Sequence, residues 1–94
     1  MKIYLAGKIT GDSNYKEKFR KAAERIESHG DIVLNPAELP RELSTIEAMR
    51  LCLPMLLQAD AIALLPDWTQ SKGADIECQL AAYCGIERVF LEET

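Results

Sequence analysis

Residues 60–66 read DAIALLP, and the centre of this stretch, Ala61–Leu65, is a continuous apolar run of strand length. Unbroken apolar runs of this kind are typical of strands that are covered on both faces, as in a parallel sheet. Three further short segments, Lys2–Ala6, Ile32–Leu34 and Arg88–Leu91, also have the composition of strands. The sequence therefore predicts four strands, with Ala61–Leu65 as the most deeply buried one.

Helical patterns separate these strands. After Asn14, apolar residues recur every three or four positions until Gly30, which is expected to end the first helix in a left-handed conformation. Ser44 and Glu47 form a capping box that opens a second helix, and Pro54 is expected to kink or break that helix. The apolar side of the second helix is predicted to consist of Ile46, Met49, Leu53, Leu56 and Leu57.

The third helix is predicted over roughly Lys72–Cys84, with Ser71 as its N-cap. Its predicted buried stripe consists of Ile76, Leu80 and Tyr83. The resulting order β-α-β-α-β-α-β implies parallel strands joined by right-handed crossovers. We expect one domain over residues 1–94, an α/β protein of three α/β/α layers with a small flavodoxin-like sheet in the order 2-1-3-4.

Composition excludes several classes of function. The 94 residues carry a net charge of −4, so we expect no nucleic-acid polymer as a partner. No apolar run is long enough for a membrane span, and no leader is recognisable at the N-terminus, so no membrane partner is expected. Three cysteines without a C-x-x-C pair and a single histidine give no expectation of a metal or another cofactor. The thiols are expected to be reduced, in a cytoplasmic protein.

Ligands of such sheets bind at the carboxyl ends of the strands, where the loops Gly7–Ser13 and Pro66–Ser71 should meet. The first loop matches neither the Walker pattern nor G-x-G-x-x-G. Its candidate ligand contacts are Gly7, Lys8, Thr10 and Gly11, since glycines let backbone N–H groups approach a ligand. The alternative is an ordinary tight turn.

The second loop leads into the third helix, whose N-terminus and Ser71 could bind an anion. Trp68 is either a platform for stacking a base or a residue of loop packing. Glu77 follows within two turns, at the predicted edge of the core. Near the positive end of the helix it is expected to stay ionised, as a carboxylate nucleophile must. The alternative for Glu77 is a solvated carboxylate that interacts with the helix dipole.

Four segments in this order resemble nucleoside 2-deoxyribosyltransferase-like proteins, in particular the small branch frequent in phages and prophages. These segments are Tyr4-Leu5-Ala6-Gly7 with Thr10-Gly11, Asn35-Pro36-Ala37, Asp60 to Trp68, and Ser71-Lys72-Gly73-Ala74 through Glu77. The resemblance covers nearly the whole chain. It implies an enzyme that cleaves or exchanges the N-glycosidic bond of 2-deoxynucleosides or their 5′-monophosphates.

The resemblance also implies roles for individual residues. Glu77 matches the nucleophile that forms a covalent deoxyribosyl-enzyme, and Tyr4 matches a tyrosine that orients it. Ser71 matches a residue that binds the 5′-phosphate in nucleotide-cleaving relatives, with Lys8 opposite and Gly73 in the same motif. The chain departs from the family at Cys52, where an acid contacts the leaving base, and at Thr10, where relatives that cleave nucleotides have arginine.

Two other functions are compatible with these residues. One is a non-catalytic module that binds a nucleoside or nucleotide. The other is a small α/β interaction protein that pairs with a second copy of itself, and a homo-oligomer such as a homodimer is expected in either case because a chain of this size buries a modest core.

Overall fold

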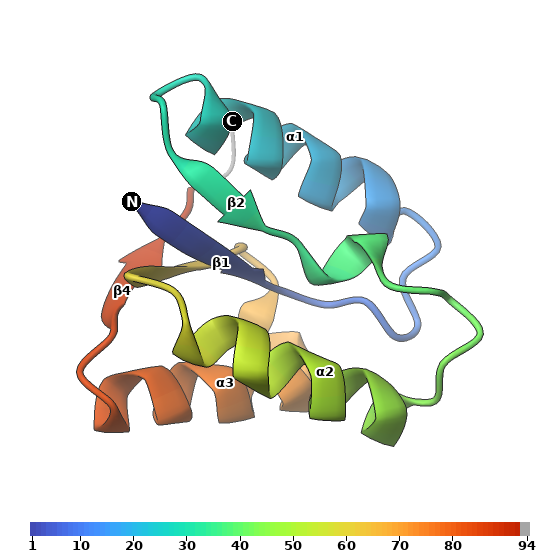
Figure 1. The fold of residues 1–94 in the computed structure, drawn as a ribbon. Coiled ribbons are helices and arrows are strands. Elements are labelled where there is room, and N and C mark those ends of the chain that lie inside the picture. Colours follow the sequence, from blue (N-terminus) through green and yellow to red (C-terminus); the bar gives the residue numbers. More distant parts are fainter. Residues whose placement is uncertain (93–94) are drawn as a thin grey trace.

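The computed structural model describes residues 1–92, so Glu93 and Thr94 of the predicted 1–94 domain lie outside the described residues. Four strands alternate with three α-helices, and two short 3-10 helices precede α2 and α3 (Figure 1). The elements are β1 (Lys2–Ala6), α1 (Tyr15–Glu27), β2 (Ile32–Leu34), η1 (Pro36–Glu38), α2 (Thr45–Leu57), β3 (Ala61–Leu64), η2 (Trp68–Gln70), α3 (Lys72–Tyr83) and β4 (Glu87–Phe90).

The sheet is parallel throughout and has the order β2-β1-β3-β4, which confirms the predicted fold class and strand order. Helix α1 covers one face of the sheet, and α2 and α3 lie together on the other (Figure 1). β3 is buried along its whole length, as its apolar run predicts, whereas the edge strand β4 is exposed at every residue. No helix within residues 1–92 has the length and apolar character needed to cross a membrane.

Alternation along β1 places its side chains on opposite faces of the sheet. Ile3 and Leu5 pack with Phe19 of α1, whereas Tyr4 and Ala6 face the layer of α2 and α3. Tyr4 pairs with Ile62 in the register of β1 and β3, so its side chain rises from the centre of the sheet. This register positions the Tyr4 hydroxyl between the sheet and the two helices.

The predicted buried side of α2 is partly wrong. The helix buries Cys52 and Leu56, while Ile46 and Leu57 are exposed. Of the predicted kink or break at Pro54, the break is absent, because α2 runs without interruption through that residue. Pro54 lies on the exposed side of the helix, where water can solvate the backbone carbonyl that its missing N–H leaves free.

The predicted buried stripe of α3 is partly wrong as well, since only Leu80 of its three residues packs, half-buried, against the core. Ile76 and Tyr83 are exposed, and the helix instead buries Ala74, Glu77, Cys78 and Ala81. Small side chains let the helix lie close to the sheet, and this close approach carries Glu77 into the core. The position of Glu77 at the edge of the core, which rested on Ile76 being buried, is therefore corrected: its side chain is only 5% exposed.

Candidate active site

A cavity of about 360 Å³ lies where the carboxyl end of β1 meets α2 and the start of α3. Of the predicted site residues, seven line this cavity: Tyr4, Gly7, Thr10, Cys52, Ser71, Gly73 and Glu77. They come from three separate segments of the chain, which the parallel topology brings together at one end of the sheet.

A buried hydrogen bond joins two of these residues. The Tyr4 hydroxyl donates to Oε2 of Glu77 at 2.5 Å, across the space between β1 and α3. Tyr4 is fully buried and its ring belongs to the core between the sheet and the helices. Because the ring is held by packing, the hydroxyl fixes the position of the carboxylate at the cavity wall.

Burial raises the pKa of Glu77 to about 7, although the hydrogen bond from Tyr4 acts in the opposite direction. The expectation that Glu77 stays ionised because of the helix dipole is therefore corrected: desolvation is the dominant effect, and near neutral pH the ionised and protonated forms coexist. Burial, together with the adjacent Glu77, also raises the pKa of Tyr4 well above its usual range. Tyr4 thus keeps its hydroxyl proton, which it donates to the ionised Glu77, at any physiological pH.

Cys52 is a third polar group at this wall. It is buried in the second turn of α2. Burial raises the pKa of its thiol, a hydrogen bond with Tyr4 lowers that pKa, and the charge of Glu77 raises it, so that the net change is upward. The thiol is therefore protonated at neutral pH. The cavity therefore has an uncharged thiol at the position where the resemblance implies an acid.

Ser71 is the N-cap of α3, as predicted, and its Oγ accepts a hydrogen bond from the backbone N–H of Ala74 at 3.1 Å. Ser71, Lys72, Gly73 and Ala74 all line the cavity, so the first turn of α3 faces it. Backbone N–H groups of a first helical turn have no partner within the helix and carry partial positive charge. This part of the cavity is suited to an anionic group.

Three predicted residues, Lys8, Gly11 and Trp68, do not line this cavity. Gly11 lines an adjoining groove of about 630 Å³, which shares Thr10 and Cys52 with the cavity. The Trp68 ring packs against Phe90 with 5.9 Å between ring centroids. Of the two alternatives for Trp68, this contact favours loop packing.

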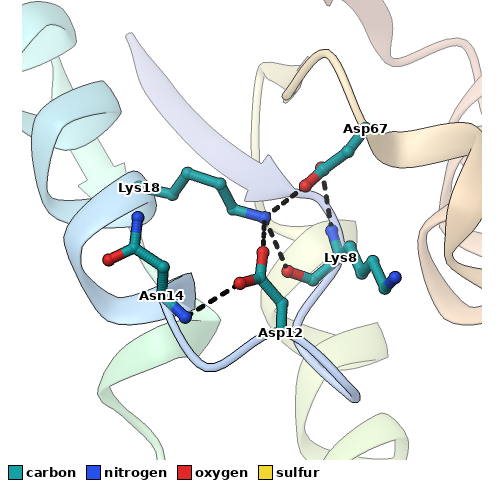
Figure 2. A network of polar contacts seen from close by, with 5 residues as sticks. All are labelled: Lys8, Asp12, Asn14, Lys18 and Asp67. Carbon is teal, nitrogen blue, oxygen red and sulfur yellow. Dashed lines mark hydrogen bonds and ion pairs between the residues drawn. The ribbon is translucent and has the colours of Figure 1, made fainter.

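Sequence reasoning missed a polar network beneath the first loop (Figure 2). The Lys18 ammonium donates to Asp12, to Asp67 and to the backbone carbonyl of Lys8, so it joins the loops after β1 and β3 to α1. Asp67 also accepts the backbone N–H of Lys8 at 3.1 Å, and Asp12 accepts that of Asn14 at 2.8 Å. Hydrogen bonding to Lys18 lowers the pKa of Asp12.

This network had one sequence signal. Asp12 and Asp67 belong to the two loops that were expected to meet, and Lys18 follows within the first turn of the adjoining helix. Opposite charges at these positions could have suggested a bridge. Helical periodicity alone assigns Lys18 to the solvated face, because it carries no information about loops that are distant in sequence.

Replacing Lys18 by methionine is expected to lower the midpoint of thermal unfolding by a few degrees. The change leaves two carboxylates close together without the cation between them, in a partly exposed site where solvent weakens the effect. Lys21→Met, on an exposed position of the same helix, is the matched control and should leave the midpoint unchanged. Equal midpoints for the two variants would contradict a stabilising role for the network.

Gly7→Ala is expected to lower the free energy of unfolding of the protein by about 1–3 kcal/mol, because the added methyl group overpacks a buried position. A Cβ at Gly7 would lie 2.6 Å from Cδ1 and 2.9 Å from Cβ of Leu65. At Gly73 the nearest atom is Sδ of the flexible Met49, at 3.3 Å, so Gly73→Ala is the control and should cost less. Urea denaturation measures both free energies of unfolding, and a Gly73 variant that is the less stable of the two would contradict this account.

The described residues contain no group of three or more His, Cys, Asp or Glu side chains that could hold a metal ion.

Two solved structures have folds similar to that of this protein. The structure is similar to that of a 2-deoxyribosyltransferase from Bacillus psychrosaccharolyticus, with a TM-score of 0.77 and 22% identity over 96% of this chain and 71% of that one. It is also similar to a conserved protein from Enterococcus faecalis V583, with a TM-score of 0.70 and 19% identity over 96% of this chain and 62% of that one. At these identities the similarity concerns the fold.

No curated protein matches the chain in sequence. A protein-family model described as "Domain of unknown function (DUF4406)" matches residues 1–90, which is almost the whole chain. The protein therefore belongs to the DUF4406 family.

Proposed function

We propose that this protein cleaves or transfers the N-glycosidic bond of 2-deoxynucleosides or their 5′-monophosphates, with Glu77 as the nucleophile. The observation that carries the proposal is the buried pair of Glu77 and Tyr4 at the wall of a cavity. The fold shared with a 2-deoxyribosyltransferase supports it. We also propose that the chain is a member of the nucleoside 2-deoxyribosyltransferase-like superfamily, in its small phage and prophage branch.

In the proposed reaction, an oxygen of the ionised Glu77 attacks the anomeric carbon of the sugar. The C–N bond breaks with its electron pair going to the base, and a covalent glycosyl-enzyme ester remains. Water or a second base then releases the sugar from Glu77. Tyr4 holds Oε2 through its hydrogen bond, so it is a positioning residue for the carboxylate.

The 5′-phosphate is proposed to bind at the first turn of α3. Ser71, Lys72 and the backbone of Gly73 line the cavity there, with Gly7 and Thr10 of the first loop beside them. Gly11 lines the adjoining groove and has the Lys8 side chain beside it, so both would contact a ligand that extends beyond the cavity. Trp68 would meet only a ligand that reaches η2.

We further propose that the protein is a cytoplasmic homo-oligomer. The helix layer exposes several large apolar side chains, which a second copy could cover: Ile46, Leu51, Leu57, Ile76 and Tyr83. Sedimentation at increasing protein concentration tests this point, and a monomer at the highest concentration would exclude it.

The function is tested by incubating the protein with a panel of deoxynucleosides and their 5′-monophosphates. Chromatography should detect the released base, and mass spectrometry of the intact protein should detect an increase by the mass of one deoxyribosyl or phosphodeoxyribosyl group. Saturable binding without base release or adduct would instead support the non-catalytic nucleotide-binding module. Absence of binding to the whole panel would contradict both functions.

A further inference from the structure

The cavity contains a buried carboxylate that has no cationic partner within residues 1–92. Glu77 accepts a hydrogen bond from the uncharged Tyr4 hydroxyl, and none of the ion pairs among these residues includes Glu77. Buried charges in proteins are normally paired, because removal from water is costly. A positively charged group of a ligand would therefore complement this carboxylate.

The part of α2 that lines the cavity is uncharged and polarisable. It contributes the methyl group of Ala48, the thioether of Met49 and the thiol of Cys52. Sulfur atoms make favourable contacts with aromatic rings, and flat rings commonly bind against such walls. The cavity is thus suited to an aromatic ring close to Glu77.

The rim of the cavity is electropositive, in contrast to the wall at Glu77. Lys72 and the N-terminal turn of α3 line it there, and both favour an anion. A ligand that matches the whole cavity has an anionic group at one end and a cationic aromatic ring at the other. A nucleotide whose base is attached to the sugar through a positively charged ring nitrogen has this distribution of charge.

We propose that the substrate class of this cavity is an N-glycosyl pyridinium nucleotide, with its cationic ring against Glu77 and its phosphate at the first turn of α3. The inference rests on the proposed function in taking an N-glycosidic nucleotide as the ligand. It goes further because it specifies a base that is positively charged while it is attached to the sugar.

The chemistry of this leaving group is consistent with the groups in the cavity. When Glu77 attacks the anomeric carbon, the C–N bond breaks and its electron pair returns to the ring nitrogen. The ring departs as a neutral pyridine without gaining a proton, and the carboxylate becomes a neutral ester. Tyr4 and Cys52, whose pKa values are both raised by burial, then do not need to supply a proton.

Nicotinamide mononucleotide and its reduced 1,4-dihydro form provide a pair of probes with the same sugar and phosphate and nearly the same size. They differ by one hydride, whose addition removes both the positive charge and the aromaticity of the ring. Calorimetry at about pH 8, where Glu77 is mostly ionised, should show that the wild-type protein binds the oxidised form at least about tenfold more tightly. Glu77→Gln should lose this preference. Glu87→Gln, the same change at an exposed position on β4, should retain it.

Equal or weaker binding of the oxidised form by the wild type would overturn the inference, and so would binding of neither form. This comparison needs no variant, so it remains decisive if Glu77→Gln is poorly folded. A preference that persists in a folded Glu77→Gln variant would also overturn it. Base release from deoxynucleotides without charge preference would refute this inference alone, whereas charge preference without any cleavage would refute the proposed function alone.

Discussion

Glu77→Gln is expected to lower the rate of base release by at least about 10³-fold, while the affinity for a nucleotide with an uncharged base changes by only a few-fold. Glutamine has the size of glutamate and can still accept the Tyr4 hydrogen bond, so the wall of the cavity should be preserved. Its amide oxygen is a much weaker nucleophile than a carboxylate, and the covalent intermediate would not form. Single-turnover kinetics and mass spectrometry of the glycosyl-enzyme measure this loss.

Two further variants test whether the loss of base release is specific to the Glu77 carboxylate. Glu87→Gln alters an exposed glutamate on β4 and should leave the rate unchanged. Tyr4→Phe removes the donor to Glu77 but keeps the buried ring, so it should lower kcat by a smaller factor than Glu77→Gln. If the Glu77→Gln protein releases base as fast as the wild type, a different group is the nucleophile.

The arrangement of strands could be predicted because each strand is a local feature. Ala61–Leu65 has the continuous apolar character of an interior parallel strand, and the alternation of strands with helices restricts the possible topologies to a few. The same topology brought Tyr4, Ser71 and Glu77 to one end of the sheet. The position of the cavity therefore followed from general rules for parallel sheets.

The orientation of α3 could not be predicted from hydrophobicity. Ile76 and Tyr83 are large and apolar but exposed, and Leu80 is only half-buried, whereas Ala74 and Ala81 are fully buried. The size of the space between helix and sheet decides this choice, and that space depends on neighbouring elements such as α2. The burial of Glu77, and with it the raised pKa, depends on this orientation.

The network around Lys18 was not predicted either, because it also depends on the tertiary structure. Its members Asp12 and Asp67 are far apart in the sequence, and charged residues in loops are usually solvated. Figure 2 shows that the three side chains converge because the first turn of α1 lies beside both loops. Which charges pair in such a place is decided by the tertiary structure.

The free energy of unfolding of the wild type is expected to fall relative to that of Glu77→Gln by about 3 kcal/mol as the pH rises from about 4 to about 8. Burial raises the pKa of Glu77 in the folded protein from the ordinary value of 4.5 to about 7. Between these two values the folded state binds more protons than the unfolded state, so stability decreases with rising pH. Below pH 4.5 the carboxyl is protonated in both states, and above pH 7 the full cost of burying the charge is present.

Urea denaturation of both proteins across this pH range measures the difference. Other carboxylates, such as Asp12, Glu17 and Glu47, whose hydrogen bonds lower their pKa values, titrate in both proteins and cancel when one curve is subtracted from the other. Glu87→Gln should give a curve parallel to that of the wild type. A constant difference between wild type and Glu77→Gln would mean that the carboxylate is solvated in the folded protein. A difference that grows as the pH rises would mean instead that its ionisation opposes folding, as expected for a charge kept in the cavity for a ligand.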